Sequence, residues 1–193
     1  MPTTCTAFAG FQRIASGPLE QVARAVKAAL DTNEGRPLLV FDDASGKPID
    51  LDLRGTVEEI LARLPKEPLP STEEPPRGPG RPKLGVVARE VTLLPRHWDW
   101  LASQPGGASV ALRKLVDAAR VTHAGADRRR AAREAADRFM SALAGDEPGY
   151  EEAARALYAG DQLRFEESIA GWPADVRRHA LQLSTGAFDD GGA

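Results

Sequence analysis

The sequence predicts an α+β protein in which a small mixed module precedes a region that is mostly helical. Three observations support this fold class. β-prone stretches gather mainly in the first third of the chain, prolines crowd residues 65–83, and apolar residues then recur at helical spacing. A chain of 193 residues is long enough for one mid-sized domain or two small ones. Hydrophobic residues make up 42% of the chain and aromatic residues only 6%, so the core is expected to be mainly Leu, Val and Ala.

The first 64 residues are expected to form a module of the order βαββα. Residues 6–14 mix apolar and β-prone side chains and predict a strand, which a helix follows. A second strand is expected at residues 38–41, and residues 42–46 have the composition of a turn. The alternating apolar residues of the returning strand are Ile49, Leu51 and Leu53. Thr56 and Glu59 then have the spacing of a capping box, which predicts the last helix of the module.

Residues 65–83 are predicted to be a linker, because proline lacks a backbone N–H and breaks helices. Seven prolines fall in this stretch, at positions 65, 68, 70, 75, 76, 79 and 82. Near its end, Gly80-Arg81-Pro82 is flanked by basic residues and resembles an AT-hook, a short element that binds the minor groove of A·T-rich DNA. The resemblance implies that Arg81 and Lys83 contact DNA. The alternative is a basic hinge.

Residues 84–122 are predicted to form a strand, a helix, a turn and a second helix. Residues 86–94 are β-prone, Pro95 favours a helix start, a Gly-Gly pair stops that helix, and Ser109 can cap the next one. This order resembles the ribbon-helix-helix family of bacterial DNA-binding proteins. The alternative is an ordinary helical hairpin with a leading strand.

The ribbon-helix-helix resemblance implies an obligate homodimer, in which one strand from each chain joins an antiparallel ribbon that enters the major groove of DNA. It also implies that the start of the second helix holds a phosphate. The DNA-binding residues expected from this segment and the hook-like core are Arg81, Lys83, Arg89, Thr92, Ser109, Arg113 and Lys114. Which face of the strand would read bases stays open, because one face carries Ala88, Glu90 and Thr92 and the other carries Arg89, Val91 and Leu93.

Residues 123–186 are expected to be helical throughout, and residues 187–193 are expected to form a disordered tail. Residues 145–149 contain two glycines and a proline, so they should interrupt the helices. Asp161 is expected to cap a later helix and Pro173 to begin the last one.

The charge of the chain changes sign along the sequence. Residues 77–138 carry 13 Lys/Arg against 6 Asp/Glu, a net charge of +7. Residues 1–76 carry 8 against 12 (net −4), and residues 139–193 carry 4 against 10 (net −6). The densest basic cluster consists of Arg128, Arg129, Arg130 and Arg133. Together with Lys114 it is a candidate phosphate-contacting surface, the alternative being a solvated helix face, and the acidic C-terminal helices are candidates for binding another protein.

The sequence contains no pattern typical of catalysis or of metal binding. Its three histidines match no zinc spacing, it has no Gly-x-Ser-x-Gly elbow, and its adjacent Glu pairs point in different directions on a helix. A single cysteine cannot form an internal disulfide. We therefore expect a protein that is not an enzyme, uses no cofactor, lies in the cytoplasm, and has neither a signal peptide nor a membrane span.

These observations predict a dimeric DNA-binding protein, either a transcriptional regulator or a nucleoid-associated protein. The alternative is a protein–protein adaptor, and a weaker third reading is an enzyme whose site is assembled from dispersed residues. Trp98 fits the apolar face of its helix and is expected in the core, whereas Trp100 lies on another face and is a candidate dimer, domain or partner contact. Through residues 91–120 and 157–161, the whole chain is also similar in layout to an uncharacterised bacterial family.

Overall fold

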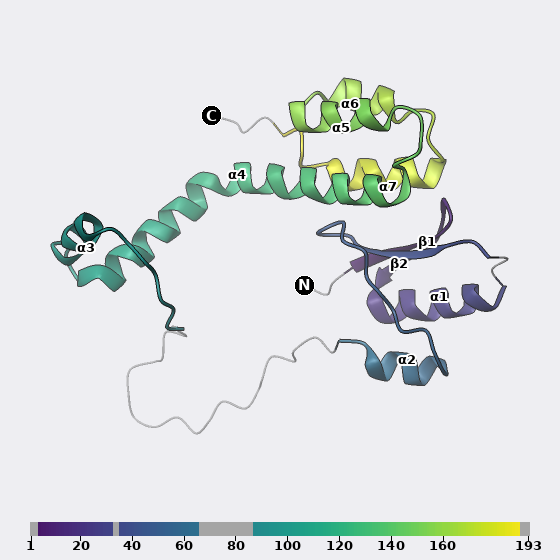
Figure 1. Cartoon of the computed structure of the whole chain (residues 1–193), viewed down its shortest axis with the longest axis horizontal. Helices are drawn as coiled ribbons and strands as arrows, with labels where there is room; N and C mark the ends of the chain where they lie inside the picture. The colour runs from purple at the N-terminus through teal and green to yellow at the C-terminus, as the bar shows by residue number, and fades with distance from the viewer. Residues whose placement is uncertain (1–3, 33–34, 66–86, 190–193) are drawn as a thin grey trace. The chain divides into compact units, whose positions relative to one another are not determined.

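The computed structural model describes residues 4–32, 35–65 and 87–189 (Figure 1). The described chain is mixed α+β, as predicted, with a small antiparallel sheet and a larger helical part. It divides into two compact units. Residues 1–65 with 125–193 form what we call the core unit, and residues 66–124 form what we call the hairpin unit. This grouping differs from the sequence-based division, which separated residues 1–64 from the C-terminal helices.

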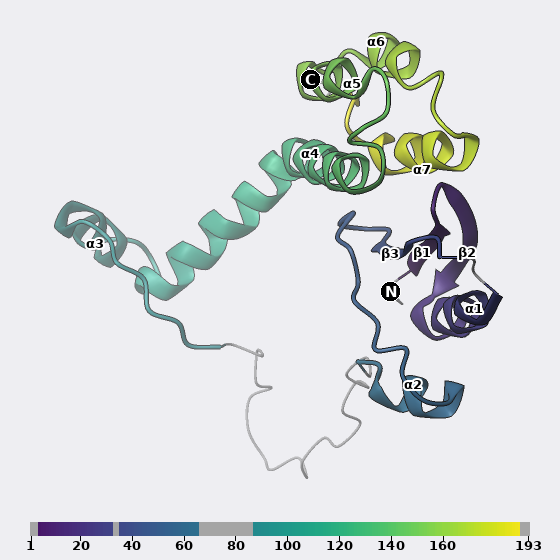
Figure 2. The same ribbon diagram turned by 45° about the vertical axis from the view of Figure 1, so that its right-hand side comes forward.

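The sheet of the core unit has three antiparallel strands in the order β2-β1-β3. They are β1 (Thr4–Ala9), β2 (Gln12–Pro18) and β3 (Leu38–Asp42). Because β1 lies between the other two, every one of its residues after Thr4 is buried, and each of its faces meets a different layer of helices (Figures 1 and 2).

The predicted order βαββα is wrong at two places. The single strand expected at residues 6–14 is a hairpin, because Gly10 adopts a positive φ of 56°, which lets the chain reverse within two residues. The strand expected after the turn is reduced to an isolated bridge between Phe41 and Pro48, flanked by the hydrogen bonds from Ile49 N to Val40 O and from Asp42 N to Lys47 O. Residues 49–54 then continue as irregular chain.

One face of the sheet is covered by α1 (Leu19–Thr32), and α2 (Val57–Arg63) contacts α1 (Figure 2). The apolar side of α1 packs on the sheet in a small cluster formed by Cys5, Ala7, Val22, Val26 and Val40. The predicted capping box is confirmed: the Thr56 hydroxyl accepts from Glu59 N, and the Glu59 carboxylate accepts from Thr56 N at 2.9 Å.

The helical part consists of α4 (Gly107–Leu143), α5 (Tyr150–Ala159), α6 (Gln162–Ser168) and α7 (Ala174–Ser184). The predicted break after α4 and the predicted start of α7 are both confirmed. So is the cap of α6, where the Asp161 carboxylate accepts from a backbone N–H of the first turn at 3.0 Å.

The main core joins the two ends of the chain. Phe8 and Phe41 from the sheet pack against Phe139 of α4, with ring centroids 5.5 and 5.0 Å away. Trp172 belongs to the same cluster and donates from Nε1 to the carbonyl of Pro148 at 2.9 Å. The sheet and the C-terminal helices therefore form one hydrophobic core, although their sequences are about a hundred residues apart.

The turn after β3 lies directly against α4 at Gly46. A Cβ on this glycine would collide with the carbonyl group of Ala135, and its φ of 64° is in the left-handed region. Next to it, Arg138 donates to the carbonyl of Ser45 at 2.8 Å. Glycine is therefore required here both for its backbone conformation and for the space it leaves.

Residues 187–189 differ from the predicted disordered tail, which was expected to begin at residue 187. Ala187 is fully buried, and the Phe188 ring lies 5.4 Å from that of Phe165. These two side chains extend the core of the helical part by a further layer.

The strand that the sequence predicted for the hairpin unit is absent from its described residues. Its described residues 87–94 form no strand, and α3 (Pro95–Ala102) follows them and is joined to α4 by a tight turn. Two glycines of this turn, Gly106 and Gly107, have positive φ. Because α4 begins at Gly107, Ser109 is its third residue and not its cap. The structure thus gives no evidence for a ribbon-helix-helix segment; β-prone residues need a partner strand to form a ladder, and residues 87–94 pair with none in the described chain.

Candidate anion-binding site

The predicted DNA-binding residues are not all placed by the structure. Arg81 and Lys83, with the hook-like core and most of the predicted linker, lie outside the described residues. Arg89 and Thr92 are exposed in the irregular stretch before α3. Of the remaining three, Ser109 and Arg113 are one helical turn apart on α4, where the Arg113 guanidinium donates to the Ser109 carbonyl at 3.1 Å.

The exposed residue Lys114 follows on the neighbouring face of α4. Within the described ranges, no hydrogen bond or ion pair joins Arg89 or Thr92 to these helical residues. The described members of the predicted set are therefore exposed side chains, on the stretch before α3 and on the first turns of α4.

A pocket of about 480 Å³ lies instead in the core unit, at the basic cluster of α4. We call it the arginine pocket, and the residues that line it are Ala126, Arg129, Arg130, Arg133, Glu134 and Tyr158. The first five follow one another at helical spacings of three, four or one residue, so a single stretch of α4 provides most of the wall. Tyr158 comes from the end of α5.

Two of the arginines in and beside the pocket already have carboxylate partners. Arg130 pairs with Asp127 at 2.7 Å, and Arg138, one turn further along α4, pairs with Glu134 at 2.8 Å. The second pair also occupies the only carboxylate that lines the pocket. The negative charge of that wall is therefore largely compensated within the helix itself.

Arg129 and Arg133 have backbone carbonyl partners and no carboxylate in the part of the chain that is described. Arg129 donates from Nη1 to the carbonyl of Asp189, and Arg133 donates from Nε to that of Ala187, both at 3.2 Å. These contacts fix the two guanidinium groups but do not neutralise them. Each group keeps further N–H donors, so the pocket presents two uncompensated positive charges one helical turn apart.

The turn that ends α5 lies against the side chain of Arg133. Gly160 caps α5 with a φ of 79°, and a Cβ on it would lie only 3.1 Å from Nη2 of Arg133. The structure thus joins two sequence features that were noted separately, the arginine cluster and the turn at residues 157–161. The sequence did not predict that Tyr158 lines the site, because no local pattern links this residue to α4, which ends fifteen residues earlier.

Tyr158 is held in place while its ring stays accessible. Its hydroxyl donates to the Asp137 carboxylate at 3.0 Å, and 52% of the residue is exposed. Burial of the hydroxyl, together with its hydrogen bond to Asp137, raises the pKa of Tyr158 above its usual value. The phenol therefore stays protonated at neutral pH and adds no negative charge beside the arginines.

The core unit also contains a row of neighbouring polar side chains, but unlike the arginine pocket it ends at a histidine that a ligand cannot reach. Ser16 and Thr6 are 3.0 Å apart, Thr6 donates to Asp43 at 2.8 Å, and Nε2 of His179 lies 3.7 Å from the same carboxylate. His179 is only 1% exposed and lies between two phenylalanine rings, at centroid distances of 4.6 and 5.5 Å. A substrate cannot reach this imidazole, so the arrangement stabilises the fold and does not resemble an open catalytic site.

Burial lowers the pKa of His179, and the Asp43 carboxylate only partly opposes this effect. Neither ring nitrogen has a hydrogen-bond partner among the described groups. The imidazole is therefore neutral at neutral pH.

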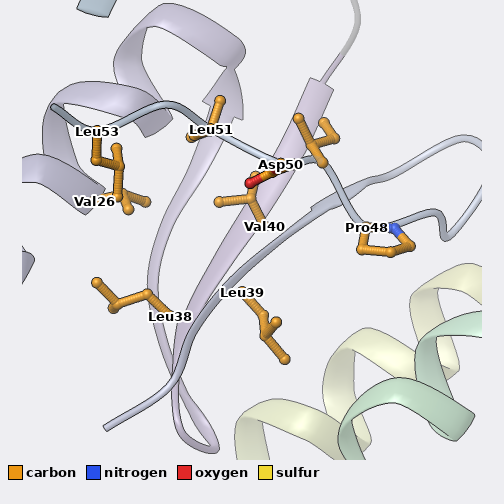
Figure 3. Close-up of a pocket in the computed structure, with 9 residues that line it drawn as sticks. Val26, Leu38, Leu39, Val40, Pro48, Asp50, Leu51 and Leu53 are labelled. Carbon is orange, nitrogen blue, oxygen red and sulfur yellow. The ribbon is translucent and has the colours of Figure 1, made fainter. Parts of the chain in front are cut away.

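A second pocket, of about 270 Å³, lies beside β3 (Figure 3). Its walls come from α1, β3 and the irregular chain after the turn, and they are apolar apart from Asp50. The side chains that line it are Val26, Leu38, Leu39, Val40, Pro48, Ile49, Asp50, Leu51 and Leu53. Its single charged side chain, Asp50, is acidic, so this pocket has no side chain that would attract an anion.

The hairpin unit exposes large apolar side chains over most of its described length. Its large exposed hydrophobic residues are Val87, Val91, Leu94, Trp98, Trp100, Leu115, Val116 and Val121. Among its described residues, 87–124, only Leu101 and Ala111 are buried. The prediction that Trp98 belongs to a core is wrong, since 41% of this residue is exposed: the short α3 meets too little neighbouring chain to cover it.

The described residues contain neither a candidate metal site nor a candidate membrane-spanning helix. Over residues 4–32, 35–65 and 87–189, no group of three or more His, Cys, Asp or Glu side chains could hold a metal ion. In the same ranges no helix combines the length and the apolar character needed to cross a bilayer.

The fold and the site define a mixed, mostly helical protein with an arginine-lined pocket formed by α4 and α5. The model of a bacterial family described as "Uncharacterized protein conserved in bacteria (DUF2239)" matches residues 4–184, and the chain belongs to this family. The sequence-based similarity to an uncharacterised bacterial family is thereby confirmed. No curated protein and no solved structure gave a match.

Proposed function

We propose that this protein binds nucleic acid and that the arginine pocket is a principal phosphate contact. The observation that carries the proposal is the state of Arg129 and Arg133, which are fixed by backbone carbonyls and have no carboxylate partner among the described residues. Guanidinium groups suit phosphate oxygens well, since they donate from several N–H groups in a planar arrangement. In this proposal the protein acts as a regulator of transcription or as a nucleoid-associated protein, and not as an enzyme.

The basic residues outside the pocket add to this proposal without defining a second site. Arg113, Lys114 and Arg120 lie on the first half of α4 and are exposed. The hook-like Arg81 and Lys83 stay a prediction for the minor groove. Together these cations would raise the local concentration of a polyanion around α4.

The proposal is tested by fluorescence anisotropy with a short labelled DNA duplex at several salt concentrations. The variant Arg129→Gln/Arg133→Gln removes both charges but keeps an amide that can donate to the same carbonyls. Each lost phosphate contact should reduce the slope of log affinity against log salt by about 0.9, so the double variant should lose roughly 1.8.

The matched control is Arg155→Gln/Arg178→Gln, which removes the same charge from two exposed arginines that already pair with Glu152 and Asp175. This control should keep a slope close to that of the parent. If both double variants bind DNA equally well, the pocket is not the phosphate contact. If the parent itself shows no salt-dependent binding either to this duplex or to the corresponding single strand, the nucleic-acid proposal fails.

A second candidate function is that of a protein–protein adaptor that also self-associates, and the apolar surface of the hairpin unit favours it. Two buried side chains are too few to hold a helical hairpin, so a covering partner would stabilise it. The sequence predicts a homodimer. Light scattering should then give a dimer mass at micromolar concentration, and Trp100→Ser should shift the protein toward the monomer. A parent protein that is monomeric throughout would exclude self-association.

A further inference from the structure

We propose that the arginine pocket accommodates one nucleotide of a single strand, with its phosphate on Arg129 and Arg133 and its base on the ring of Tyr158. This inference rests on the proposed function and specifies the form of nucleic acid that the pocket selects. It goes beyond phosphate binding, because two positive charges alone would serve a duplex and a single strand alike.

The first argument concerns the ring of Tyr158. About half of this residue is exposed, yet its hydroxyl is tied to Asp137 at 3.0 Å. The hydrogen bond limits rotation of the side chain, so an incoming planar group meets a ring that is already oriented. Aromatic rings positioned in this way beside a positive groove are the usual platforms for the bases of single strands.

The second argument concerns the neighbourhood of the ring. Tyr158 and the two arginines line the same pocket, and its volume of about 480 Å³ lies in the range of small-molecule sites. A base in a duplex is stacked between its neighbours and cannot reach a ring in such a pocket, whereas an unstacked base can. The pocket is thus suited to a nucleotide whose base is free.

Three carboxylates beside the pocket, which could repel a phosphate, have partners within the chain. Glu134 is held by Arg138 at 2.8 Å, and Asp137 accepts the Tyr158 hydroxyl. Asp127, which lies one turn before, is held by Arg130 at 2.7 Å. Asp127 and Glu134 are thus each compensated by an arginine, which leaves Arg129 and Arg133 as the arginines of the pocket that have no carboxylate partner in the described chain.

The test compares a labelled single-stranded oligonucleotide, the corresponding duplex and a single strand of the same length made entirely of abasic sites. Binding to each is measured by anisotropy for the parent, Tyr158→Ala and Tyr158→Phe. We expect Tyr158→Ala to weaken binding of the ordinary single strand about tenfold, a loss typical of one aromatic stacking contact. Binding of the duplex and of the abasic strand should stay within about twofold of the parent.

Tyr158→Phe keeps the ring but removes the hydrogen bond to Asp137, so it should retain most of the affinity for the ordinary strand. Thermal unfolding of each variant shows that the fold is intact. Equal losses on all three nucleic acids, or no loss on any of them, would overturn the stacking inference.

The arginine variants separate this inference from the proposed function. If Arg129→Gln/Arg133→Gln weakens binding of every nucleic acid while Tyr158→Ala changes none, phosphate binding stands and the single-strand preference falls. If neither variant changes binding of any of the three, the proposed site fails together with the inference.

Discussion

The core unit and the hairpin unit are built from similar helices, but they differ in what those helices cover. In the core unit, a sheet and four helices bury a set of large side chains that includes Phe8, Phe41, Phe139 and Trp172. In the described part of the hairpin unit, only Leu101 and Ala111 are buried, and both tryptophans are largely exposed. Since each large apolar side chain contributes about 1.5–3 kcal/mol when buried, the two units must differ greatly in intrinsic stability.

This difference indicates which apolar side chains are covered within the chain and which remain available to a partner. The core unit buries most of its large apolar side chains and presents charge at the arginine pocket. The hairpin unit presents apolar side chains that a partner would cover.

The largest effect is expected from Phe139→Ala, which removes the ring between Phe8 and Phe41. The cavity and the lost transfer energy should lower the free energy of unfolding of the core unit by about 3–5 kcal/mol. Urea unfolding monitored by circular dichroism measures the change. The comparison variant is Leu101→Ala in the hairpin unit, which should leave the main transition within about 0.5 kcal/mol of the parent. Equal shifts for both variants would contradict the division into two units.

A somewhat smaller loss, roughly 2–4 kcal/mol, is expected from Gly46→Ala, because the new Cβ meets the Ala135 carbonyl group in a backbone conformation that already disfavours alanine. Gly35→Ala provides the matched control. Gly35 has a similar positive φ of 82°, but no heavy atom lies within 4 Å of its added Cβ. That variant should lose only about 1 kcal/mol, the contribution of the backbone alone. Equal losses would show that the turn can move away from α4.

The third prediction concerns pH. The pKa of His179 is lowered in the folded chain by burial, and the charged groups that face the ring are Asp43, which opposes this effect, and Arg13, which adds to it. Below a pH of about 6.5 the unfolded chain binds a proton that the folded chain does not, so stability should fall as the pH decreases from 7 towards 5. The slope cannot exceed about 1.4 kcal/mol per pH unit for one group.

Urea unfolding at a series of pH values measures this slope. His179→Gln should flatten the profile between pH 7 and 5, whereas His123→Gln, which changes an exposed histidine on α4, should leave it unaltered. A profile that keeps its slope in His179→Gln would assign the dependence to other groups.

The sequence predicted the local features of the fold better than its long-range contacts. The capping box at Thr56, the cap at Asp161 and the interruption after α4 depend on residues a few positions apart, and all three are confirmed. The fold class is confirmed in its coarse form. The hairpin at Gly10 was not predicted, because a glycine can also lie within a continuous strand. Only the pairing of β1 with β2 and β3 shows that the chain reverses there.

The sequence predicted only some of the residues that form the candidate site. Arg129 and Arg133 were recognised as basic, but whether a charged side chain is neutralised depends on neighbours that one sequence does not place. Their carbonyl partners at residues 187 and 189 lie more than fifty positions away, in a segment expected to be a disordered tail. The strand predicted at residues 86–94 is absent from the described residues because it has no partner strand there. β-propensity favours a strand only where another strand is available to pair with it.

The distribution of the three tryptophans also gives the protein a built-in optical contrast. Trp172 is almost fully buried with its indole N–H on a carbonyl, whereas 41% of Trp98 and 51% of Trp100 are exposed. Emission from the buried indole should lie at shorter wavelength and resist quenching by acrylamide, while the other two should emit at longer wavelength and be quenched readily. Events at the hairpin unit can therefore be followed without a label in the same sample in which Trp172 reports on the integrity of the core unit.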